Sequence, residues 1–370
     1  MSGPIFIVGT MRSGSTLLRL ILDSHPNVAI GPESGFMGAA SAMKAIPAWD
    51  AGPGWYDRFG LDEAQMDARI RRFFCDIFER YATERGKVRW GDKTPFHTWH
   101  VEQMARIFPD AVFIGIVRHP SAAGVSMRRW RYSFADGISK WVRANAEIVR
   151  QARRLGPQRF AVCRYEDLVL APEPTLRALL DFLGEPWSDR LLAHDQVQRD
   201  QQTPAVADGG ARPGDPIDAA RVAQWVHEIT PEERAMVAAR VPSALLDLFG
   251  YRTDHAEPLP LAERSAGGAP GLVPVEHADV DALPRGKYAV GAFDPDRTAL
   301  PADPAELAHR LQKAERRLER LAARPDVRVA RTLKALRRSR PLRVLRQGLW
   351  TGRNRSAPPQ PPAAQGGRAR

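Results

Sequence analysis

The chain has 370 residues, which is enough for one large domain with appendages. Its net charge of +11 is uneven, because residues 310–370 contain 18 Lys and Arg against 3 Asp and Glu, whereas the rest of the chain contains 36 against 40. This near-neutral body argues against a nucleic-acid partner.

Neither a targeting segment nor a membrane span is expected. The first predicted strand begins at Pro4, which leaves no room before it for a charged region and an apolar region. No later stretch is apolar enough to cross a bilayer. Cys75 and Cys163 lie far apart, in a predicted helix and a predicted strand, so we expect small core side chains and no disulfide or metal pair. We therefore expect a cytoplasmic protein.

Residues 4–24, PIFIVGTMRSGSTLLRLILDS, predict a buried strand, a tight loop and an amphipathic helix. Such a loop directs backbone N–H groups and the positive end of the helix dipole at one point, which favours an anion. Ser13, Ser15 and Thr16 add hydroxyl donors there. The segment therefore predicts an anion site, although an ordinary capped connection between strand and helix would also fit this pattern.

The position of the cation in this loop distinguishes it from a Walker A loop. Gly9 and Gly14 keep the Walker glycine spacing, but Ser15 stands where that motif has its lysine. The positive charge lies inside the loop instead, as Arg12. This departure argues against an ATP-dependent phosphotransferase and favours another phosphate-bearing ligand.

The next elements carry a carboxylate and a lysine. A short strand over residues 28–30 ends just before Glu33, at the edge where ligands bind in open α/β sheets. Residues 36–60 look rich in loops, and residues 62–85 have the apolar spacing of a helix. Lys93 then lies in a segment that reads as a turn and is closed by a proline, so it is expected to be solvated unless the site recruits it.

Residues 111–117 form the most apolar predicted strand, which we expect in the centre of the sheet. An NTPase would be expected to place a magnesium-binding Asp at the end of such a strand. This strand ends in Arg118, which can clamp a phosphate, and Ser126 follows on a predicted helix. A solvated arginine at a strand end is the alternative.

The remaining body of the chain alternates helices and strands. A helix is predicted over residues 138–155 and a strand over 159–163, which leads into Tyr165. Residues 199–216 are expected to form a flexible loop that can close over a ligand. Further predicted helices cover residues 172–183, 219–226, 231–240 and 242–248.

The composition changes beyond residue 255. We expect a domain over residues 1–255, a Pro/Gly/Ala-rich linker or weakly ordered extension over 256–304, a basic amphipathic helical tail over 305–350 and a disordered end over 351–370. Leucines and an alanine at alternating spacings of four and three over 307–321 predict a short coiled-coil seam.

Several ordered blocks over residues 4–251 resemble the sulfotransferase superfamily, and most of all its branch of tyrosylprotein sulfotransferases and their bacterial relatives. These blocks are PIFIVGTMRSGSTLLRLILDSHPNV, GPES, GDKTPF, FPDAVFIGIVRHPSAAGVSM, RYEDLVLAPEPTLRALLDFLGEPW and VAQWV. The resemblance implies an α/β, three-layer, P-loop-like fold with a central parallel sheet flanked by helices. It also implies 3′-phosphoadenosine 5′-phosphosulfate (PAPS) as co-substrate, without a metal.

The resemblance assigns roles to individual residues. Glu33 falls at the catalytic base, and Lys93 matches the lysine that supports the leaving group. Arg118 and Ser126 fall where the 3′-phosphate is held, and Tyr165 matches a tyrosine that contacts the nucleotide. The 5′-phosphosulfate falls on the first loop and helix start, which are Arg12, Ser13, Gly14, Ser15, Thr16 and Leu17.

The implied mechanism is in-line transfer of a sulfuryl group to a hydroxyl or amine. Glu33 takes the acceptor proton, while Arg12 and Lys93 stabilise the charge on the leaving phosphate. His97 and His119 remain alternative bases, because some branches of the superfamily use histidine. One departure is Ala223, which stands where the branch has a serine that helps to hold the phosphosulfate.

Other functions and partners remain open from the sequence. The competing classes are an ATP-dependent phosphotransferase and a nucleotide-binding protein anchored to a membrane by its basic tail. That tail suggests a weak homodimer or peripheral attachment to an anionic membrane, although such charge runs are often only solvated helices. Four acceptor classes stay open: a peptide tyrosine, a carbohydrate, a lipid and a small natural product.

Overall fold

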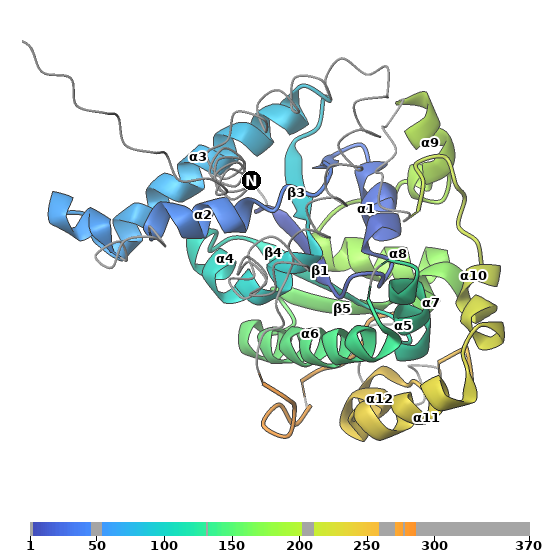
Figure 1. Cartoon of the computed structure of the whole chain (residues 1–370). Coiled ribbons are helices and arrows are strands. Elements are labelled where there is room, and N and C mark those ends of the chain that lie inside the picture. Colours follow the sequence, from blue (N-terminus) through green and yellow to red (C-terminus); the bar gives the residue numbers. More distant parts are fainter. Residues whose placement is uncertain are drawn as a thin grey trace, which may run out of the picture. The chain divides into compact units, whose positions relative to one another are not determined.

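The computed structural model describes residues 3–45, 54–130, 132–201, 211–258, 271–276 and 278–285. Its core is one five-stranded sheet in the order β2-β3-β1-β4-β5, in which every neighbouring pair is parallel (Figure 1). The strands are β1 (Ile5–Gly9), β2 (Val28–Ile30), β3 (Arg89–Lys93), β4 (Val112–Val117) and β5 (Phe160–Arg164). The expected α/β fold with a central parallel sheet is therefore confirmed.

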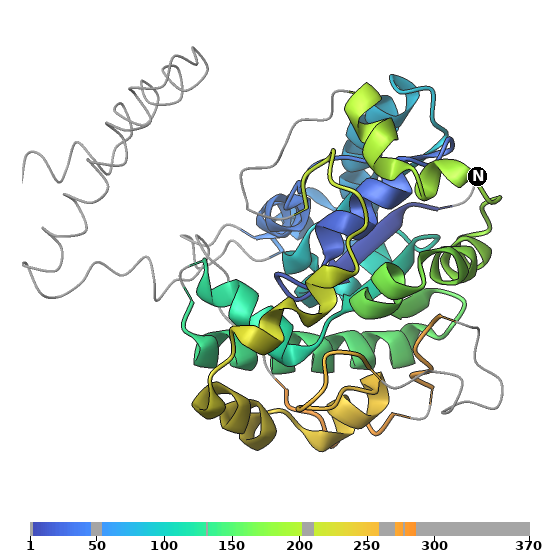
Figure 2. The same ribbon diagram turned by 90° about the vertical axis from the view of Figure 1, so that its right-hand side faces the viewer.

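Helices cover both faces of this sheet (Figures 1 and 2). Alternate residues of β1 point to opposite faces, as in any strand, so Ile5 and Ile7 join one apolar cluster and Phe6 and Val8 the other. The first cluster includes α1 (Ser15–Asp23), α7 (Tyr165–Leu170) and α8 (Pro172–Leu183). The second includes α3 (Glu63–Thr83), α4 (Val101–Ile107), α5 (Pro120–Arg128) and α6 (Phe134–Leu155).

Shorter elements surround these layers. The remaining α-helices are α2 (Phe36–Lys44), α9 (His194–Asp200), α10 (Ala220–Ala223), α11 (Pro231–Arg240) and α12 (Ser243–Phe249). The 3-10 helices are η1 (Trp55–Phe59), η2 (Pro95–His100), η3 (Asp189–Leu191) and η4 (Gln224–His227). The helices expected near residues 219–248 are present with small shifts at their ends.

The segment around Lys93, expected to be a turn, is instead the interior strand β3. Its sequence RWGDK has one large apolar residue, Trp90, whose ring stacks on Phe78 with centroids 4.7 Å apart. Arg89 is buried, and its guanidinium donates hydrogen bonds to the carbonyls of Gly3 and Leu183 at 2.8 and 2.7 Å. Buried polar groups with partners have therefore replaced the apolar run that usually marks an interior strand.

The expectation of a loop-rich segment over residues 36–60 was also wrong in part. Residues 36–44 form α2, which buries Phe36, Met37 and Ala40 against the core. A 3-10 helix, η1, covers residues 55–59, and residues 46–53 lie outside the described part of the chain. Only three of the nine residues of α2 are buried, so its sequence shows little helical periodicity.

Part of the expected linker packs on the body of the protein. The buried side chains of Val273, Val275 and Leu283 belong to the second apolar cluster. The backbone N–H of Val273 donates to the carbonyl of Val162 in the edge strand β5 at 2.7 Å. The described residues 271–276 and 278–285, which fall in the expected linker, therefore contribute side chains to this core. The predicted seam and basic tail lie outside the described residues.

Two other sequence features can be compared with the described residues. Cys75 and Cys163 are both free thiols, of which Cys163 is buried in β5 and Cys75 is partly buried on α3. Burial raises the pKa of Cys75 to about 11. Within the described ranges, no helix is both long enough and apolar enough to cross a bilayer.

Candidate active site

The loop between β1 and α1 has a strained but well-supported backbone. Arg12 adopts φ 69°, the left-handed region that non-glycine residues seldom occupy, and Gly14 adopts φ 92°. A side chain at Gly14 would place its Cβ 2.3 Å from the ring of Tyr165, so glycine is required there for space as well as conformation. The Tyr165 ring therefore forms a wall directly against the loop.

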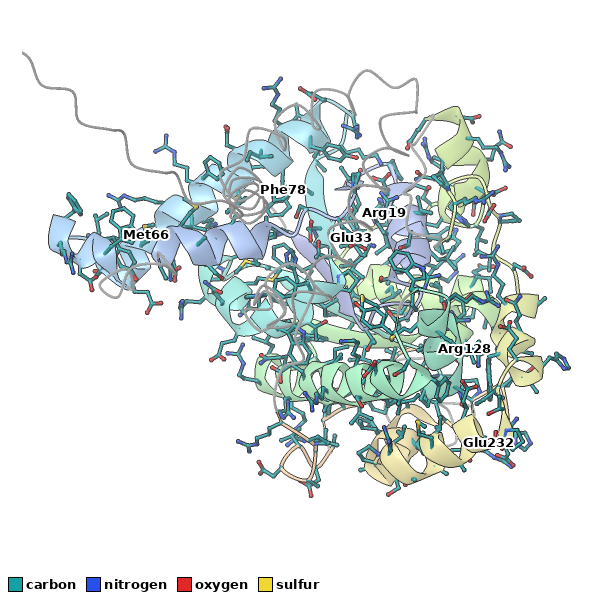
Figure 3. All side chains as sticks on the ribbon, viewed as in Figure 1. Arg19, Glu33, Met66, Phe78, Arg128 and Glu232 are labelled. Carbon is teal, nitrogen blue, oxygen red and sulfur yellow. The ribbon has the colours of Figure 1, made fainter. Side chains whose placement is uncertain are left out.

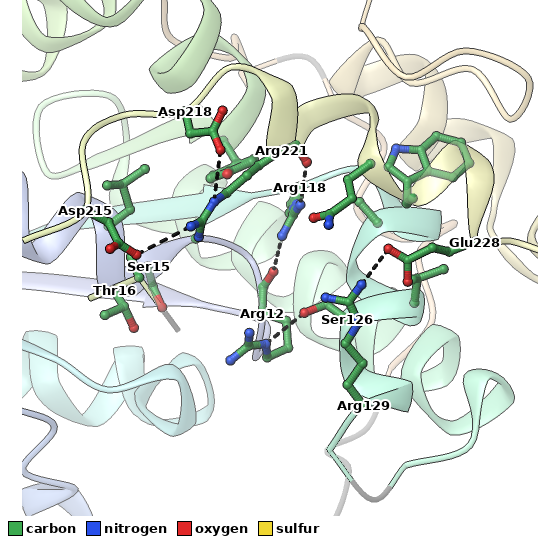
Figure 4. Close-up of a pocket in the computed structure, with 18 of the residues that line it drawn as sticks. Arg12, Ser15, Thr16, Arg118, Ser126, Arg129, Asp215, Asp218, Arg221 and Glu228 are labelled. Carbon is green, nitrogen blue, oxygen red and sulfur yellow. Dashed lines mark hydrogen bonds and ion pairs between the residues drawn. The ribbon is translucent and has the colours of Figure 1, made fainter. Parts of the chain in front are cut away.

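Side chains from distant parts of the sequence hold Arg12 in place. Arg12 Nε donates to Ser126 Oγ on α5 at 2.9 Å, and Arg118 Nη1 donates to the Arg12 carbonyl at 3.4 Å (Figure 4). The Arg118 guanidinium also lies 4.4 Å from the Tyr165 ring centroid, within cation–π distance. The structure thus brings Arg12, Arg118, Ser126 and Tyr165 together, and their roles toward a ligand stay a prediction.

These groups line one pocket at the carboxyl edge of the sheet, next to the strand-order reversal at β1. The predicted Gly14, Ser15, Thr16 and Leu17 also line it, whereas Ser13 is buried in the loop. Figure 4 shows Arg129 and Arg221 at the same pocket, paired respectively with Glu228 and with Asp215 and Asp218. The sequence analysis missed these two arginines as site residues.

Ala223 is exposed at the end of α10 and does not line this pocket. Its neighbours Gln224 and Trp225 do line it. The position expected to matter through the loss of a serine therefore contributes no side chain to the pocket wall here. The expected closing loop is described only in part, as α9 and residues 211–216, because residues 202–210 lie outside the described ranges.

A buried network supports the end of β4 behind Arg118. The Glu166 carboxylate accepts the backbone N–H of His119 and the Tyr251 hydroxyl, each at 2.9 Å. The His119 ring stacks on Trp225 with centroids 4.5 Å apart. Burial lowers the pKa of His119 to about 4, and it raises the pKa of Glu166. This network fixes the turn that carries Arg118.

Lys93 links Glu33 to the first loop. Its ammonium forms an ion pair with Glu33 Oε1 and donates to Thr16 Oγ1 at 3.1 Å. The Lys93 side chain is only 3% exposed, whereas that of Glu33 is 39% exposed, so the carboxylate is open to an incoming group. Figure 3 labels Glu33 near the carboxyl edge of the sheet, close to α1. The carboxylate, the lysine and the anion loop are therefore contiguous.

The two alternative bases are engaged in structural contacts. His97 is buried, with Nδ1 3.0 Å from Asp92 Oδ2, and its Nε2 accepts the backbone N–H of Met37 at 3.4 Å. His119 Nε2 lies 2.8 Å from the Arg252 carbonyl, and Nδ1 accepts the N–H of Ser121. His97 is thus enclosed beside Asp92, and His119 uses both ring nitrogens inside the protein, which favours Glu33 as the group that meets an acceptor.

The donor groups of the pocket suit a ligand with several negative charges. They combine guanidinium groups, hydroxyls and the N-terminal end of α1. Among the described residues, no group of three or more His, Cys, Asp or Glu side chains is arranged to hold a metal ion. The pocket thus offers donors for phosphate groups at the loop, and one lysine separates the Glu33 carboxylate from Thr16.

Comparison with known proteins shows which family the chain resembles in sequence. Residues 4–189 match the family described as the sulfotransferase family. Protein-tyrosine sulfotransferase 1 of Danio rerio is 30% identical over 277 residues, which cover 69% of this chain and 73% of that protein. Protein-tyrosine sulfotransferase 2 of Gallus gallus is 31% identical over 206 residues, covering 52% of this chain and 54% of that protein.

A solved structure with a similar chain path is the sulfotransferase domain of the Synechococcus PCC 7002 olefin synthase. It has 24% sequence identity and a TM-score of 0.45, and the match covers 65% of this chain and 95% of that domain.

Proposed function

Because this chain belongs to the sulfotransferase family, we propose that it transfers the sulfuryl group of PAPS to a hydroxyl acceptor. The observation that carries the proposal is the contact chain from Glu33 to Lys93 and from Lys93 to Thr16, which connects a carboxylate through one lysine to the start of α1 beside the anion loop. Arg12, Arg118 and Ser126 at the same loop supply the charge and hydroxyl donors that a nucleotide with two phosphate positions requires.

In the proposed reaction, Glu33 removes the acceptor proton as the acceptor oxygen forms a bond to sulfur. The bond between sulfur and the bridging phosphate oxygen breaks on the opposite side. Negative charge then gathers on the departing 5′-phosphate, where Arg12 and Lys93 stabilise it. Lys93 begins this step paired with Glu33, so protonation of the carboxylate frees the ammonium to face the phosphate.

The acceptor that we propose is the phenolic hydroxyl of tyrosine in a peptide, because the matched relatives are named protein-tyrosine sulfotransferases. The open side of Glu33 supports access by an acceptor from solvent. A phenol also suits a carboxylate base, because its hydroxyl, with a pKa near 10, is more acidic than an aliphatic hydroxyl.

The experiment is to incubate the full chain with PAPS and a tyrosine-containing peptide and to measure the peptide mass. A gain of one sulfuryl group on tyrosine is expected, together with release of the 3′,5′-bisphosphate product. The same peptide with phenylalanine in place of tyrosine is the control. The proposal would be overturned if the chain transferred a phosphoryl group from ATP with magnesium and transferred no sulfuryl group from PAPS.

We propose in addition that the enzyme acts in the cytoplasm and that its basic tail attaches it to anionic membranes or pairs two copies weakly. The support is the charge of residues 310–370 in the sequence, since this segment lies outside the described residues. Co-sedimentation with anionic vesicles at low salt, compared between the full chain and a chain ending after residue 288, tests it. Equal sedimentation of the two chains would show that the tail does not attach the protein to the membrane.

A further inference from the structure

Two consecutive residues of β3 bind two consecutive residues of the loop after β2, and we call these contacts the grip on the loop. Lys93 pairs with Glu33, and its neighbour Asp92 accepts both the hydroxyl and the backbone N–H of Ser34, at 2.5 and 3.3 Å. Adjacent residues of a strand point to opposite faces of the sheet. The pair Glu33-Ser34 is therefore held from both faces at the end of β3.

Further contacts extend this grip into α2. Thr94 Oγ1 accepts the N–H of Gly35 at 3.3 Å, and Ser34 Oγ accepts the N–H of Phe36 at the same distance. His97 Nε2 accepts the N–H of Met37. These acceptors satisfy the N–H groups that the start of a helix leaves unpaired. The loop that carries Glu33 is thereby joined to the segment just after β3.

Asp92 is the centre of this arrangement and is nearly inaccessible, at 2% exposure. His97 Nδ1 lies 3.0 Å from Asp92 Oδ2, and its Nε2 accepts the N–H of Met37. Burial acts to raise the pKa of Asp92, but the bonds from His97, Ser34 and Thr94 outweigh it, so the pKa lies below its usual value. The buried group is therefore a carboxylate with charge-assisted bonds to the loop.

We propose that Asp92 is a positioning residue for the general base: through Ser34, it keeps Glu33 aimed at the acceptor when the ion pair with Lys93 opens. This inference rests on the proposed function, in which Glu33 takes a proton and Lys93 turns to the leaving phosphate. One of the two grips on the loop is lost at that moment. The grip from Asp92 on Ser34 does not depend on the charge of Glu33, so it persists through the step.

The kinetic test compares Ser34→Ala and Asp92→Asn with the parent enzyme. With PAPS and the tyrosine peptide, kcat should fall roughly 10-fold for Ser34→Ala and roughly 30-fold for Asp92→Asn, because a displaced catalytic group can cost up to about 100-fold. Affinity for the 3′,5′-bisphosphate should stay within about twofold, since neither residue lines the pocket. Ser34→Thr, which keeps the hydroxyl, should restore most of kcat.

A matched control is Ser133→Ala. Ser133 Oγ also donates to an aspartate, Asp136 Oδ2 at 2.8 Å, at the start of the long helix α6. This variant should lose a helix cap with little change in kcat. An equal fall in kcat per folded enzyme for Ser133→Ala and Ser34→Ala would overturn the proposal, because a serine far from Glu33 would then matter as much as Ser34.

A double-mutant cycle tests whether Asp92 acts through Glu33. Asp92→Asn placed in a Glu33→Gln background should lower kcat less than twofold further, because the group that it positions is already absent. A full additional 30-fold loss would assign Asp92 another role. Hydrogen exchange of the amides of residues 31–37 gives a readout that needs no turnover: it should accelerate in Asp92→Asn and remain unchanged in Ser133→Ala.

The outcomes separate this inference from the proposed function. If the parent enzyme transfers no sulfuryl group to any acceptor, the proposed function fails, while hydrogen exchange still reports whether Asp92 orders the loop. If the parent is active and Ser34→Ala and Asp92→Asn match it in kcat, the proposed function stands and the positioning role is wrong.

Discussion

The two halves of the sheet on either side of β1 hold their charges in different ways. One half contains β4 and β5 and carries Arg118 and Tyr165; because the proposed function places the nucleotide there, we call it the nucleotide half. The other contains β2 and β3 and carries Glu33 and Lys93, and we call it the acceptor half for the same reason. The nearby pocket arginines Arg129 and Arg221 are about half exposed and paired with surface carboxylates. Lys93 and Asp92 are almost fully buried and bonded to loop groups.

This difference separates binding from chemistry. Exposed ion pairs are weak and can exchange partners when a charged ligand arrives. Buried charges with several partners are costly to move, so they keep one geometry. Under the proposed function, the nucleotide half can therefore adjust to its ligand, while the acceptor half keeps a fixed arrangement for proton transfer. Substitutions in the two halves should accordingly affect different measured quantities.

The largest effect should come from Glu33→Gln in the acceptor half. Glutamine keeps the shape of the side chain and cannot take the proton, so turnover should fall at least about 100-fold. Calorimetry should find nearly unchanged affinity for the 3′,5′-bisphosphate. Turnover equal to that of the parent would transfer the base role to His97 or His119 and would break the division between the halves.

In the nucleotide half, Arg118→Ala should weaken binding of the 3′,5′-bisphosphate by about 2 kcal/mol, or roughly 30-fold, through loss of a charge-assisted contact. A nucleotide without the 3′-phosphate should bind with little change, and titration calorimetry compares the two ligands. Arg128→Ala, on the neighbouring helix but bonded to Glu233, is the control. Equal weakening for both nucleotides would contradict the assignment of Arg118 to the 3′-phosphate.

A shortened chain tests how the outer edge of the nucleotide half is stabilised. Ending the chain after residue 255 removes the buried Val273, Val275 and Leu283. Their burial contributes about 1.5–3 kcal/mol each, and chain ordering offsets most of it, so a net loss on the order of 2 kcal/mol is expected. Denaturant unfolding should show no such loss for a chain ending after residue 288. Matching stabilities of all three chains would show that this segment adds nothing.

The smallest effect should follow Arg221→Ala. Its guanidinium is 3.4 Å from both Asp215 and Asp218 and is 45% exposed, so its attraction to a phosphate is screened. Bisphosphate affinity should fall about threefold at low salt, and the difference should shrink as salt is added. A loss of affinity as large as that of Arg118→Ala would indicate direct contact between Arg221 and the ligand. It would contradict the description of Arg221 as a weakly bound, screened cation.

The sequence predicted the two halves unequally. The apolar run of β4 identified an interior strand and placed Arg118 at its end. The strand β3 has no such run, because Arg89, Asp92 and Lys93 are buried through partners from remote segments. Periodicity reports contact with apolar neighbours and carries no information on long-range hydrogen bonds. The relation of Lys93 to Glu33 therefore came from family resemblance alone.

Other parts of the site depend on tertiary contacts in the same way. Arg129 and Arg221 reach the pocket because α5 and the segment around α10 meet there, which local sequence does not reveal. The doublet at residues 128–129 was visible, but only the structure shows that Arg128 bonds to Glu233 and Arg129 to the pocket residue Glu228. The grip of Asp92 on Ser34 joins residues 58 positions apart.

The bond from Val273 to Val162 has a consequence for how the protein is made. Ribosomes synthesise β5 first, and Val273 follows about 110 residues later. At ~5–20 residues per second, the outer edge of β5 waits roughly 5 to 20 s for this partner. An uncovered strand edge can pair with another chain, so the nascent protein is most exposed to aggregation in that interval. In a chain that ends before residue 273, this edge of β5 stays uncovered permanently.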